Sequence, residues 1–587
     1  MSKEITLLDD RYKHKAITPH EGWRRPGIFT PPPAVNHNST DFDHNERIFI
    51  KPTFHLQSAS TNATRNISWD LYLVNHRYEK RLIFRPTGSQ ANMSGGVQTH
   101  ALGPFEKNIA ARADHLNIAT TALKPLLSQN ASVILPTDND WDALQIRGTS
   151  PRIHPKFNAI VEPATEADVQ KTVQFASKFG IPFLAVSANF VPASIGTHGW
   201  TKTLNNLPYG IQINMRKLNS VTVDPSGNTA TIGGGTLQWE ANKVLYAKGK
   251  QAVLTLCECT SIAGPMLAGG HSMLQARHGY TLDNLVSARV ILANGTAVTA
   301  SSSSNSDLFW ALRGAGQSFG IVTSLQLNVY DIPSTWTIST FIYRSDKLEA
   351  VLDAVNKLDG DAMRSQNLVI NGPMIIYTLS YQGPEAEALP YFSKFKAIGP
   401  ITVKPSTNVN NMELYKITQN SVDSAACARN KNSMGSGVSL PSWNTTAARA
   451  AFNIFTKMTA DRRFSRSVFL LENYGMQGVR AVDPSLTSLS LEERQYPAVA
   501  NPTIWWNGTA AVGQADAEAY GEQIRQALFA GLPKGAKKHT YVNYAVGTEN
   551  FNQMYGYDTA RVQRLKTLKK AYDPENRFGF YNPVPLA

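Results

Sequence analysis

The segment from residue 287 to residue 330 constrains the fold of this chain more than any other. A β-rich run, ARVILANGTAVTA, with an Asn-Gly turn is followed by a short helical run, DLFWALR. Gly314, Gly316 and Gly320 come next, directly before a second strand-like run, IVTSLQLNVY. A Rossmann unit places its glycine-rich loop after a strand and before a helix. Because the order here is helix, glycines, strand, the segment predicts a different nucleotide-binding scaffold, which lays backbone amides against a large flat cofactor. Simple turn chemistry is the alternative.

The length and composition indicate a folded protein of several domains. A chain of 587 residues is too long for one core, and 42% apolar with 17% charged residues is typical of soluble globular proteins. No run of 18 apolar residues occurs, so we expect no membrane span. The formal charge of +13 is scattered, with short basic clusters only at 534–538 and 566–570. Since aromatic residues do not interleave with these clusters, we expect no nucleic-acid partner.

The cysteines and glycosylation sequons bear on the compartment. Cys257, Cys259 and Cys427 are too few for a disulfide framework in a chain of this size, and the CxC spacing of the first two fits no zinc site. The sequons are at Asn38, Asn62, Asn66, Asn92, Asn130, Asn294, Asn444 and Asn507. They favour a secreted glycoprotein, whereas the N-terminal residues lack a hydrophobic signal core. The sequence therefore leaves secreted and cytoplasmic locations open.

Periodicity divides the chain into regions of different character. A helix, ATEADVQKTVQFASKFG, is predicted with Thr165 as its N-cap and Gly180 at its C-terminus, followed by a strand, FLAVS. Early in the chain only a patch near 68–74 resembles a strand. The expected regions are an irregular N-terminal extension (1–105), a first α+β domain (106–331), a second α+β domain with an antiparallel sheet (332–540) and a segment that returns to the first domain (541–587).

The stretch from 256 to 285, LCECTSIAGPMLAGGHSMLQARHGYTLDNL, is the second informative segment. Its glycines permit close backbone approach to a ligand, and the polar residues after them supply hydrogen-bond donors. The residues expected to face a ligand are Gly264, Gly269, Gly270, His271 and Ser272. A thiol at Cys257 or Cys259 could attack an electrophilic ring carbon. The alternative is that both cysteines are small, buried hydrophobic residues.

A histidine lies between the FLAVS strand and the next strand, GIQIN. His198 stands in the loop IGTHGW, where it could be a nucleophile or a hydrogen-bond donor. A loop histidine that only makes structural hydrogen bonds is the alternative.

Taken together and in this order, these stretches resemble one family. The chain is similar to flavoproteins of the vanillyl-alcohol oxidase superfamily, specifically the berberine-bridge-enzyme-like FAD-linked oxidoreductases common in fungi. The matching stretches are VEPATEADVQKTVQFASKFGIPFLAV, THGW, ATIGGG, AGGHS, LDNLVSARVILANG, DLFWALRGAGQSFGIVT and the tail from YVNYAVG to AYDPENRFGFYNP. The resemblance covers 147–330 and 491–583 well and the middle of the chain weakly.

The resemblance implies a bound FAD and the fold that holds it. It implies a two-lobed PCMH-type FAD-binding domain and an α+β substrate domain with an antiparallel sheet that covers the flavin ring. Family members often attach the flavin through a histidine at the 8α carbon and a cysteine at C6, which here would be His198 and either Cys257 or Cys259. The implied cofactor-binding residues are His198, Gly199, Cys257, Cys259, Gly264, Gly269, Gly270, His271, Ser272, Asp283, Asn284, Gly314, Gly316, Gly320, Ile321 and Val322.

The resemblance also implies an activity. FAD accepts a hydride from a C–H bond beside a hydroxyl or amine while a base takes the proton, and oxygen reoxidises the flavin. Tyr541 is the expected base or its partner, and Asn543 is expected to orient the substrate, which we expect to be a small secondary-metabolite intermediate. A secreted oligosaccharide oxidase is one alternative. Because Gly196-Thr197 replaces the usual glycine pair before His198, a flavin-fold binding protein without catalysis is another. No oligomeric state is predicted.

Overall fold

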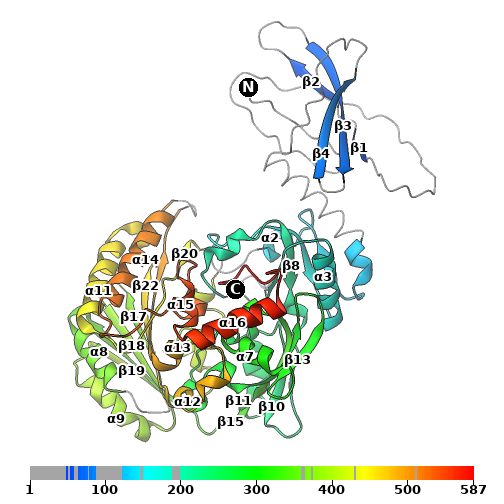
Figure 1. Cartoon of the computed structure of the whole chain (residues 1–587). Coiled ribbons are helices and arrows are strands. Elements are labelled where there is room, and N and C mark those ends of the chain that lie inside the picture. The colour runs from blue at the N-terminus through cyan, green and yellow to red at the C-terminus, as the bar shows by residue number, and fades with distance from the viewer. Residues whose placement is uncertain are drawn as a thin grey trace. The chain divides into compact units, whose positions relative to one another are not determined.

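Figure 1 shows the chain as a computed structural model. Backbone and side chains are described for 122–145, 150–187, 198–358, 374–428, 431–508 and 512–586, except the side chain of residue 426, and backbone alone for the strands within 48–87 and 364–371. The chain divides into two compact units, Met1–Asp114 and His115–Ala587. Among the helices so described, none combines the length and the apolar character needed to cross a membrane.

The first unit contains a small antiparallel sheet. Its described strands are β1 (Ile48–Ile50), β2 (Thr53–Gln57), β3 (Thr64–His76) and β4 (Glu79–Thr87). The long strand β3 pairs with each of the other three. The patch that resembles a strand in the sequence, near 68–74, lies within β3, and the other strands occupy the stretch expected to be irregular. Cross-strand pairing can impose strand structure on residues of weak intrinsic preference.

The second unit begins with a sheet flanked by a capped helix. The first elements are η2 (Lys124–Leu126), β5 (Ser132–Ile134), α2 (Trp141–Leu144), β6 (Phe157–Glu162), α3 (Glu166–Lys178), β7 (Phe183–Val186), η3 (Lys202–Asn206), β8 (Gly210–Asn214) and η4 (Met215–Lys217). The described strands lie in the order β5-β6-β8-β7, with β6, β8 and β7 parallel. Thr165 caps α3 as predicted, through a reciprocal capping box with Asp168.

An antiparallel sheet carries the segment that opened the sequence argument. The elements are β9 (Val221–Val223), β10 (Thr229–Gly233), α4 (Gln238–Tyr246), β11 (Lys250–Gln251), α5 (Ala263–Met266), α6 (Gln275–His278), η5 (Thr281–Asn284), β12 (Leu285–Ile291), β13 (Ala297–Ser301), α7 (Ser306–Ala315), η6 (Gly316–Ser318), β14 (Ile321–Asn328) and β15 (Tyr330–Asp331). The strand order is β13-β12-β14-β10-β9. The predicted sequence of hairpin, helix, glycines and strand is present, with Gly314 at φ 140°. The apolar face of α3 contacts residues of both this sheet and the preceding one, so the two lobes share a core.

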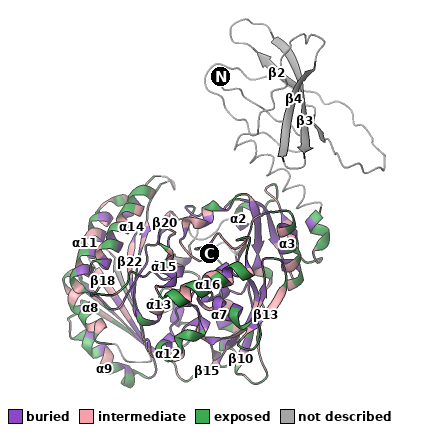
Figure 2. Cartoon of the chain, viewed as in Figure 1, coloured by how far each residue is buried: buried purple, intermediate pink, exposed green. Residues whose placement is uncertain are grey.

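A large antiparallel sheet forms the next part of the unit. The elements are β16 (Trp336–Arg344), η7 (Ser345–Lys347), α8 (Leu348–Asn356), β17 (Arg364–Asn371), β18 (Met374–Gln382), α9 (Glu385–Lys396), β19 (Thr402–Val409), α10 (Leu414–Ile417), η8 (Ala425–Cys427), β20 (Ser433–Met434), β21 (Val438–Leu440), α11 (Thr445–Ala460), η9 (Arg462–Phe464), β22 (Val468–Tyr474), α12 (Gln477–Arg480), η10 (Pro484–Leu486), α13 (Leu491–Gln495), β23 (Ala498–Trp505) and α14 (Gln514–Phe529). Helices α8, α9, α11 and α14 bury their apolar residues on this sheet in one cluster (Figure 2). The predicted α+β class with antiparallel sheets is confirmed.

The C-terminal residues pack on the first two sheets of the second unit. The elements are η11 (Val542–Tyr544), α15 (Phe551–Tyr555) and α16 (Thr559–Tyr572). Val542, Tyr555 and Leu565 belong to the same buried cluster as α7 and β14, and α16 lies along α7 in Figure 1. This return of the chain places η11 beside the residues that follow β7 and α5. The expected domain boundaries themselves stay predictions.

Candidate active site

A cavity lies among the first lobe, the β14 end of the second lobe and the C-terminal tail. It holds about 920 Å³ of empty space, counting the part open to solvent. Its walls include β7, the start of β14 and residues 577–581 of the tail. The lining residues are Phe183, Leu184, Ala185, Val186, Ser187, His198, Met215, Gly234, Ser261, Ala263, Gly264, Leu267, Gln317, Gly320, Ile321, Val322, Arg577, Phe578, Phe580 and Tyr581.

The cavity is lined by part of the expected set and by further residues that motif reasoning missed. His198, Gly264, Gly320, Ile321 and Val322 all line it. The tail residues that line it lie in the tail stretch that carries the resemblance but were not among the expected site residues, because an aromatic such as Phe578 or Tyr581 is also a common packing residue.

His198 occupies one side of the cavity with a defined hydrogen bond. Its Nε2 lies 3.0 Å from Asn543 Oδ1, and the Asn543 amide nitrogen donates to Pro265 O and to Tyr541 Oη. Since Asn543 presents its oxygen, Nε2 donates, and a neutral ring then carries its lone pair on Nδ1. Gly264 permits this placement, because a Cβ there would lie 2.6 Å from His198 Cε1. The arrangement leaves Nδ1 as the nucleophilic nitrogen.

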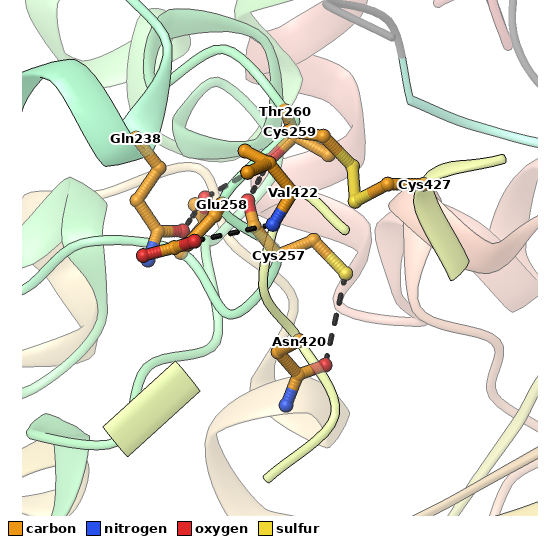
Figure 3. The surroundings of a disulfide bond; sticks show 9 residues. Gln238, Cys257, Glu258, Cys259, Thr260, Asn420, Val422 and Cys427 are labelled. Atoms are coloured by element: carbon orange, nitrogen blue, oxygen red, sulfur yellow. Dashed lines mark hydrogen bonds between the residues drawn. A yellow bond between two sulfur atoms is a disulfide. The ribbon is translucent and has the colours of Figure 1, made fainter. Parts of the chain in front are cut away.

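The cysteines divide into a disulfide and a thiol (Figure 3). Cys259 is bonded to Cys427, whose position 168 residues away in the sequence gave no signal that the two would meet. The expectation that Cys259 could attach a flavin is therefore wrong, since its sulfur is already bonded. Cys257 is the free cysteine of the described residues and is half-buried. Its Sγ points toward Asn420 Oδ1, 3.8 Å away.

The surroundings of Cys257 come from two parts of the chain. Glu258 N donates to Asn420 O at 3.0 Å, and Glu258 Oε2 accepts from Val422 N at 3.1 Å. Burial, together with the charges of Glu472 and Glu258, raises the pKa of the Cys257 thiol to about 12. The thiol therefore needs an acceptor for its proton if it is to react as a nucleophile.

Tyr541 ties the tail to the AGGHS turn. Its Oη accepts hydrogen bonds from Gly270 N at 2.9 Å, His271 N at 3.4 Å and Asn543 Nδ2 at 2.6 Å. Gly269 has φ 129° and lies against the Tyr541 ring, where a Cβ would come within 3.0 Å of Cε2. Burial raises the pKa of the Tyr541 phenol. These contacts hold Tyr541 against the AGGHS turn and Asn543; its role as the base or the base's hydrogen-bonding partner stays a prediction.

A buried carboxylate that the sequence analysis missed lies beside this tyrosine. Glu472, on β22, accepts a hydrogen bond from Tyr474 Oη at 2.8 Å and another from Tyr544 Oη at 2.9 Å. The Tyr544 and Tyr541 rings are 5.4 Å apart between centroids. A glutamate within the apolar strand VFLLENY was the available signal, because a charge in a buried strand needs a partner or a function.

The Glu472 carboxyl has the electrostatics of a proton acceptor. Burial raises its pKa, while the charge of His271 and the two phenol hydrogen bonds act in the opposite direction. Its charge also acts on Cys257, which shows that the carboxylate and the thiol are neighbours. A carboxylate with a raised pKa can take a proton near neutral pH.

Two residues expected to bind the cofactor have side chains that are paired within the protein. Asp283 pairs with Arg494 (Oδ1 to Nη2, 2.7 Å), and both are buried. Asn284 donates to two backbone carbonyls and accepts from Tyr330 Oη at 2.6 Å. Both side chains are fully engaged within the protein, so their assignment as cofactor ligands is not supported.

Gly314, Gly316 and Ser272 of the expected set also make hydrogen bonds within the protein. Gly314 N and Gly316 N both donate to Leu267 O, and Ser272 Oγ accepts from Leu274 N within its own turn. These residues shape the turns around the cavity and are absent from its lining. Gly199 adjoins the lining through Tyr581, whose Oη would be 2.3 Å from a Cβ added at Gly199.

Comparison with known protein families identifies two regions. The FAD binding domain family matches residues 157–301, and the family described as berberine and berberine like matches residues 540–585. The first region contains β7, His198, Cys257 and the AGGHS turn. The second contains η11 and the tail residues that line the cavity.

Relatives match over most of the chain. The chain is 32% identical over 491 residues to the FAD-linked oxidoreductase OXR2 of Pyricularia oryzae, covering 79% of this chain and 90% of the relative. It is 33% identical over 481 residues to the FAD-linked oxidoreductase chyH of Penicillium rubens, covering 79% and 93%.

Solved structures share the fold. Chitooligosaccharide oxidase has a TM-score of 0.68 at 20% identity, with 81% of this chain and 100% of that chain covered. Glucooligosaccharide oxidase from Acremonium strictum, whose FAD is described as 6-S-cysteinyl and 8α-N1-histidyl, has a TM-score of 0.66 at 20% identity, with 81% and 99% covered.

Proposed function

Because the chain belongs to the berberine-bridge-enzyme-like family of FAD-linked oxidoreductases, we propose that it oxidises a small molecule at a C–H bond beside a hydroxyl or amine. The observation that carries this proposal is the Glu472 carboxylate, held by two tyrosine hydroxyls next to the residues that would anchor the flavin. Bound FAD supplies the two-electron acceptor for the hydride, and oxygen reoxidises it.

The residues present fit a covalently held FAD. His198 lines the cavity and faces Gly264, and its Nε2 lies 3.0 Å from Asn543 Oδ1. Cys257 is the remaining thiol now that Cys259 is in a disulfide. We therefore assign the histidyl attachment to His198 and the cysteinyl attachment to Cys257, the two kinds of attachment described for glucooligosaccharide oxidase.

Glu472 takes the proton from the substrate in this proposal. Its pKa is raised by burial, and Tyr474 and Tyr544 hold one carboxylate oxygen each. Loss of a substrate O–H or N–H proton to Glu472 leaves the electron pair that expels the hydride from the adjacent carbon, so charge and electrons balance. Tyr541 and Asn543 act indirectly, by fixing the AGGHS turn and His198.

The choice of substrate class rests on the adjacent tryptophans Trp505 and Trp506. Trp506, one of two adjacent tryptophans that could stack on sugars, lies 4% exposed in the core of the large sheet. Trp505 lies beneath Lys431 at 5.0 Å. Since this pair cannot form an open aromatic platform for a glycan, we propose a small secondary-metabolite intermediate as substrate. Oligosaccharide oxidation, the activity for which chitooligosaccharide oxidase and glucooligosaccharide oxidase are named, is the second candidate.

A substrate panel tests the proposed function. Alcohols, phenols, amines and oligosaccharides are mixed without oxygen with the purified yellow protein, and bleaching of the flavin absorbance is followed. Release of peroxide is then measured in air. We expect at least one small alcohol, phenol or amine to bleach the flavin and to yield peroxide on aeration. Bleaching by oligosaccharides alone would favour the second candidate.

A reduction control makes a negative panel informative. Dithionite must bleach the same flavin, which shows that it is redox-active. If dithionite bleaches it and no compound of any class does, the chain is a flavin-binding protein without this catalysis.

A further inference from the structure

A buried histidine outside the cavity lies at the junction of several elements that surround Glu472. His271 follows the glycines of the AGGHS turn, and its side chain is 5% exposed. Its Nε2 lies 2.9 Å from Glu493 Oε1 on α13, and its Nδ1 lies 2.9 Å from Gln275 Oε1 on α6. Ser272 N donates to the same Gln275 oxygen at 3.2 Å, so that atom is an acceptor. Both ring nitrogens of His271 therefore face acceptors.

This geometry fixes the charge of the ring. A neutral imidazole has one N–H and could satisfy only one of the two acceptors, whereas an imidazolium satisfies both. Glu493 also accepts from His539 Nε2 at 2.7 Å. Burial opposes ionisation of Glu493, but the hydrogen bonds from both histidines outweigh it and lower its pKa to about 2. Burial likewise opposes the charge on His271, and the hydrogen bond and charge of Glu493 raise its pKa nonetheless.

The charged ring is stacked on a tyrosine that binds Glu472. The His271 and Tyr474 rings are 4.7 Å apart with 20° between their planes, and Tyr474 Oη donates to Glu472 Oε1 at 2.8 Å. A cation over the face of a phenol draws on its π-electrons and makes the hydroxyl a stronger donor. The charge of His271 also acts directly on Glu472 and favours its ionised form.

Other titratable groups also face His271. The groups packed around it are two glutamates and three tyrosines. Glu493 lies on α13 and Glu472 on β22. The ring centroids of Tyr474 on β22, Tyr541 before η11 and Tyr280 before η5 lie 4.7 Å, 4.6 Å and 5.0 Å from that of His271. The carboxylates among these are Glu493, which is paired with the histidine, and Glu472, which is paired with phenols. The imidazolium is thus the positive charge that the Glu472 carboxylate meets in this cluster.

We propose that His271 is a permanently charged positioning residue that acts through Tyr474 to hold Glu472 oriented and ionised before the substrate proton is transferred. The proposal rests on the assignment of Glu472 as the base in the proposed function. His271 itself touches neither the cavity nor the atoms expected to react. Its partner Glu493 stabilises the charge, so the relay runs from α13 through His271 and Tyr474 to Glu472.

A pH profile of flavin reduction tests this relay. His271→Gln removes the charge and keeps one hydrogen bond to Glu493. The assay uses the panel compound that bleaches the flavin fastest. We expect the rising limb of the plot of reduction rate against pH to shift to higher pH by about one unit, so that the rate at pH values below the limb falls about tenfold. The rate at high pH should recover. A profile that keeps its midpoint in His271→Gln contradicts the relay.

Two further variants make the result specific. Tyr474→Phe leaves the His271–Glu493 pair intact and removes the hydrogen bond to Glu472, so its rising limb should move in the same direction. This variant decides the question if His271→Gln does not fold. His278→Gln is the matched control, since His278 lies in the same segment, stacked on Tyr330 at 3.7 Å, away from Glu472. Its profile should keep the wild-type midpoint.

A second readout needs no substrate. In FAD-loaded protein with nitrogen-15-labelled histidine, one of the 13 histidines should show two protonated ring nitrogens up to pH 8, and this signal should vanish in His271→Gln. His278 gives an internal contrast, because burial and the charge of Arg277 lower its pKa to about 4. A neutral His271 at pH 7 overturns the proposal. Failure of the base assignment is recognised separately, by a Glu472→Gln variant that reduces its flavin at the wild-type rate.

Discussion

Asn543 connects His198 to Tyr541 through hydrogen bonds. Its oxygen accepts from His198, and its nitrogen donates to Tyr541 Oη and to Pro265 O. One amide thus sets the tautomer of the histidine and fixes the phenol that holds the AGGHS turn. The sequence predicted that Asn543 orients the substrate, which stays a prediction, and the structure shows its side chain holding protein groups. In the proposed function the substrate proton goes to Glu472, a residue that belongs to none of the motifs of the sequence analysis.

Flavin attachment gives the prediction at the scale of single residues. Peptide mass spectrometry of the wild-type protein should find flavin on the peptides that contain His198 and Cys257. Cys257→Ser should keep the histidyl bond alone, and the double variant with His198→Ala should release all yellow colour into an acid supernatant. Cys259→Ser is the matched control, because it breaks the disulfide and leaves the Cys257 thiol in place.

Two other outcomes for the flavin in these proteins would contradict covalent attachment at His198 and Cys257. If acid releases all the flavin from the wild-type protein, neither residue forms a covalent bond. If Cys257→Ser keeps a cysteinyl flavin, the attachment is at another sulfur.

At the scale of elements, the short helix α13 connects separate parts of the molecule. Arg494 on α13 pairs with Asp283 at the end of the first domain's loop, and Glu493 pairs with His271 and with His539, which precedes the tail. Removing one partner of a buried pair leaves an uncompensated charge and costs about 3–5 kcal/mol. We infer that α13 fixes the register between the AGGHS turn and the tail.

The Glu493 pair predicts how stability depends on pH. The folded pKa of Glu493 is about 2, below its ordinary value of 4.5. Its contribution is therefore present above pH 4.5 and is lost as the pH falls from 4.5 toward 2. His271 has a raised folded pKa compared with an ordinary 6.5, so its contribution is present below pH 6.5 and is lost as the pH rises through the folded pKa.

Denaturant unfolding of wild type and Glu493→Gln measures this dependence. The difference in free energy of unfolding between the two should be largest between pH 4.5 and 6.5 and should shrink on both sides. A difference that does not change with pH would mean that the carboxylate is not ionised in the folded protein or that the pair is broken.

For the whole molecule, the sequence predicted what local patterns encode. The order of α7, glycines and β14, the capping of α3 by Thr165 and the antiparallel character of the large sheet all follow from periodicity and turn residues. The bond between Cys259 and Cys427 and the contacts of Glu472 with Tyr544 join residues far apart in the chain. No spacing rule relates such pairs, because only the folded topology brings them together.

The long-range pairs also explain which expected residues changed role. Asp283 and Asn284 lie in a well-matched motif, and a motif alone does not separate a residue that contacts the cofactor from one that supports the loop. Their partners, Arg494 and Tyr330, are known only from the fold. The site is therefore assembled by the large sheet and the tail around anchors that the first domain provides.

The central claim is that Glu472, which the large sheet supplies, takes the substrate proton beside a flavin held by the first domain. Single-turnover reduction of the bound flavin without oxygen tests it most directly, with Glu258→Gln as the control for loss of a buried carboxyl near Cys257. We predict that Glu472→Gln binds flavin normally and that its flavin is reduced about 100-fold or more slowly than in wild type, as expected for loss of a general base. Glu258→Gln should stay within about threefold of wild type, well below the roughly 10²–10⁴-fold effect of a general base. A Glu472→Gln variant that reduces its flavin as fast as wild type would contradict the account.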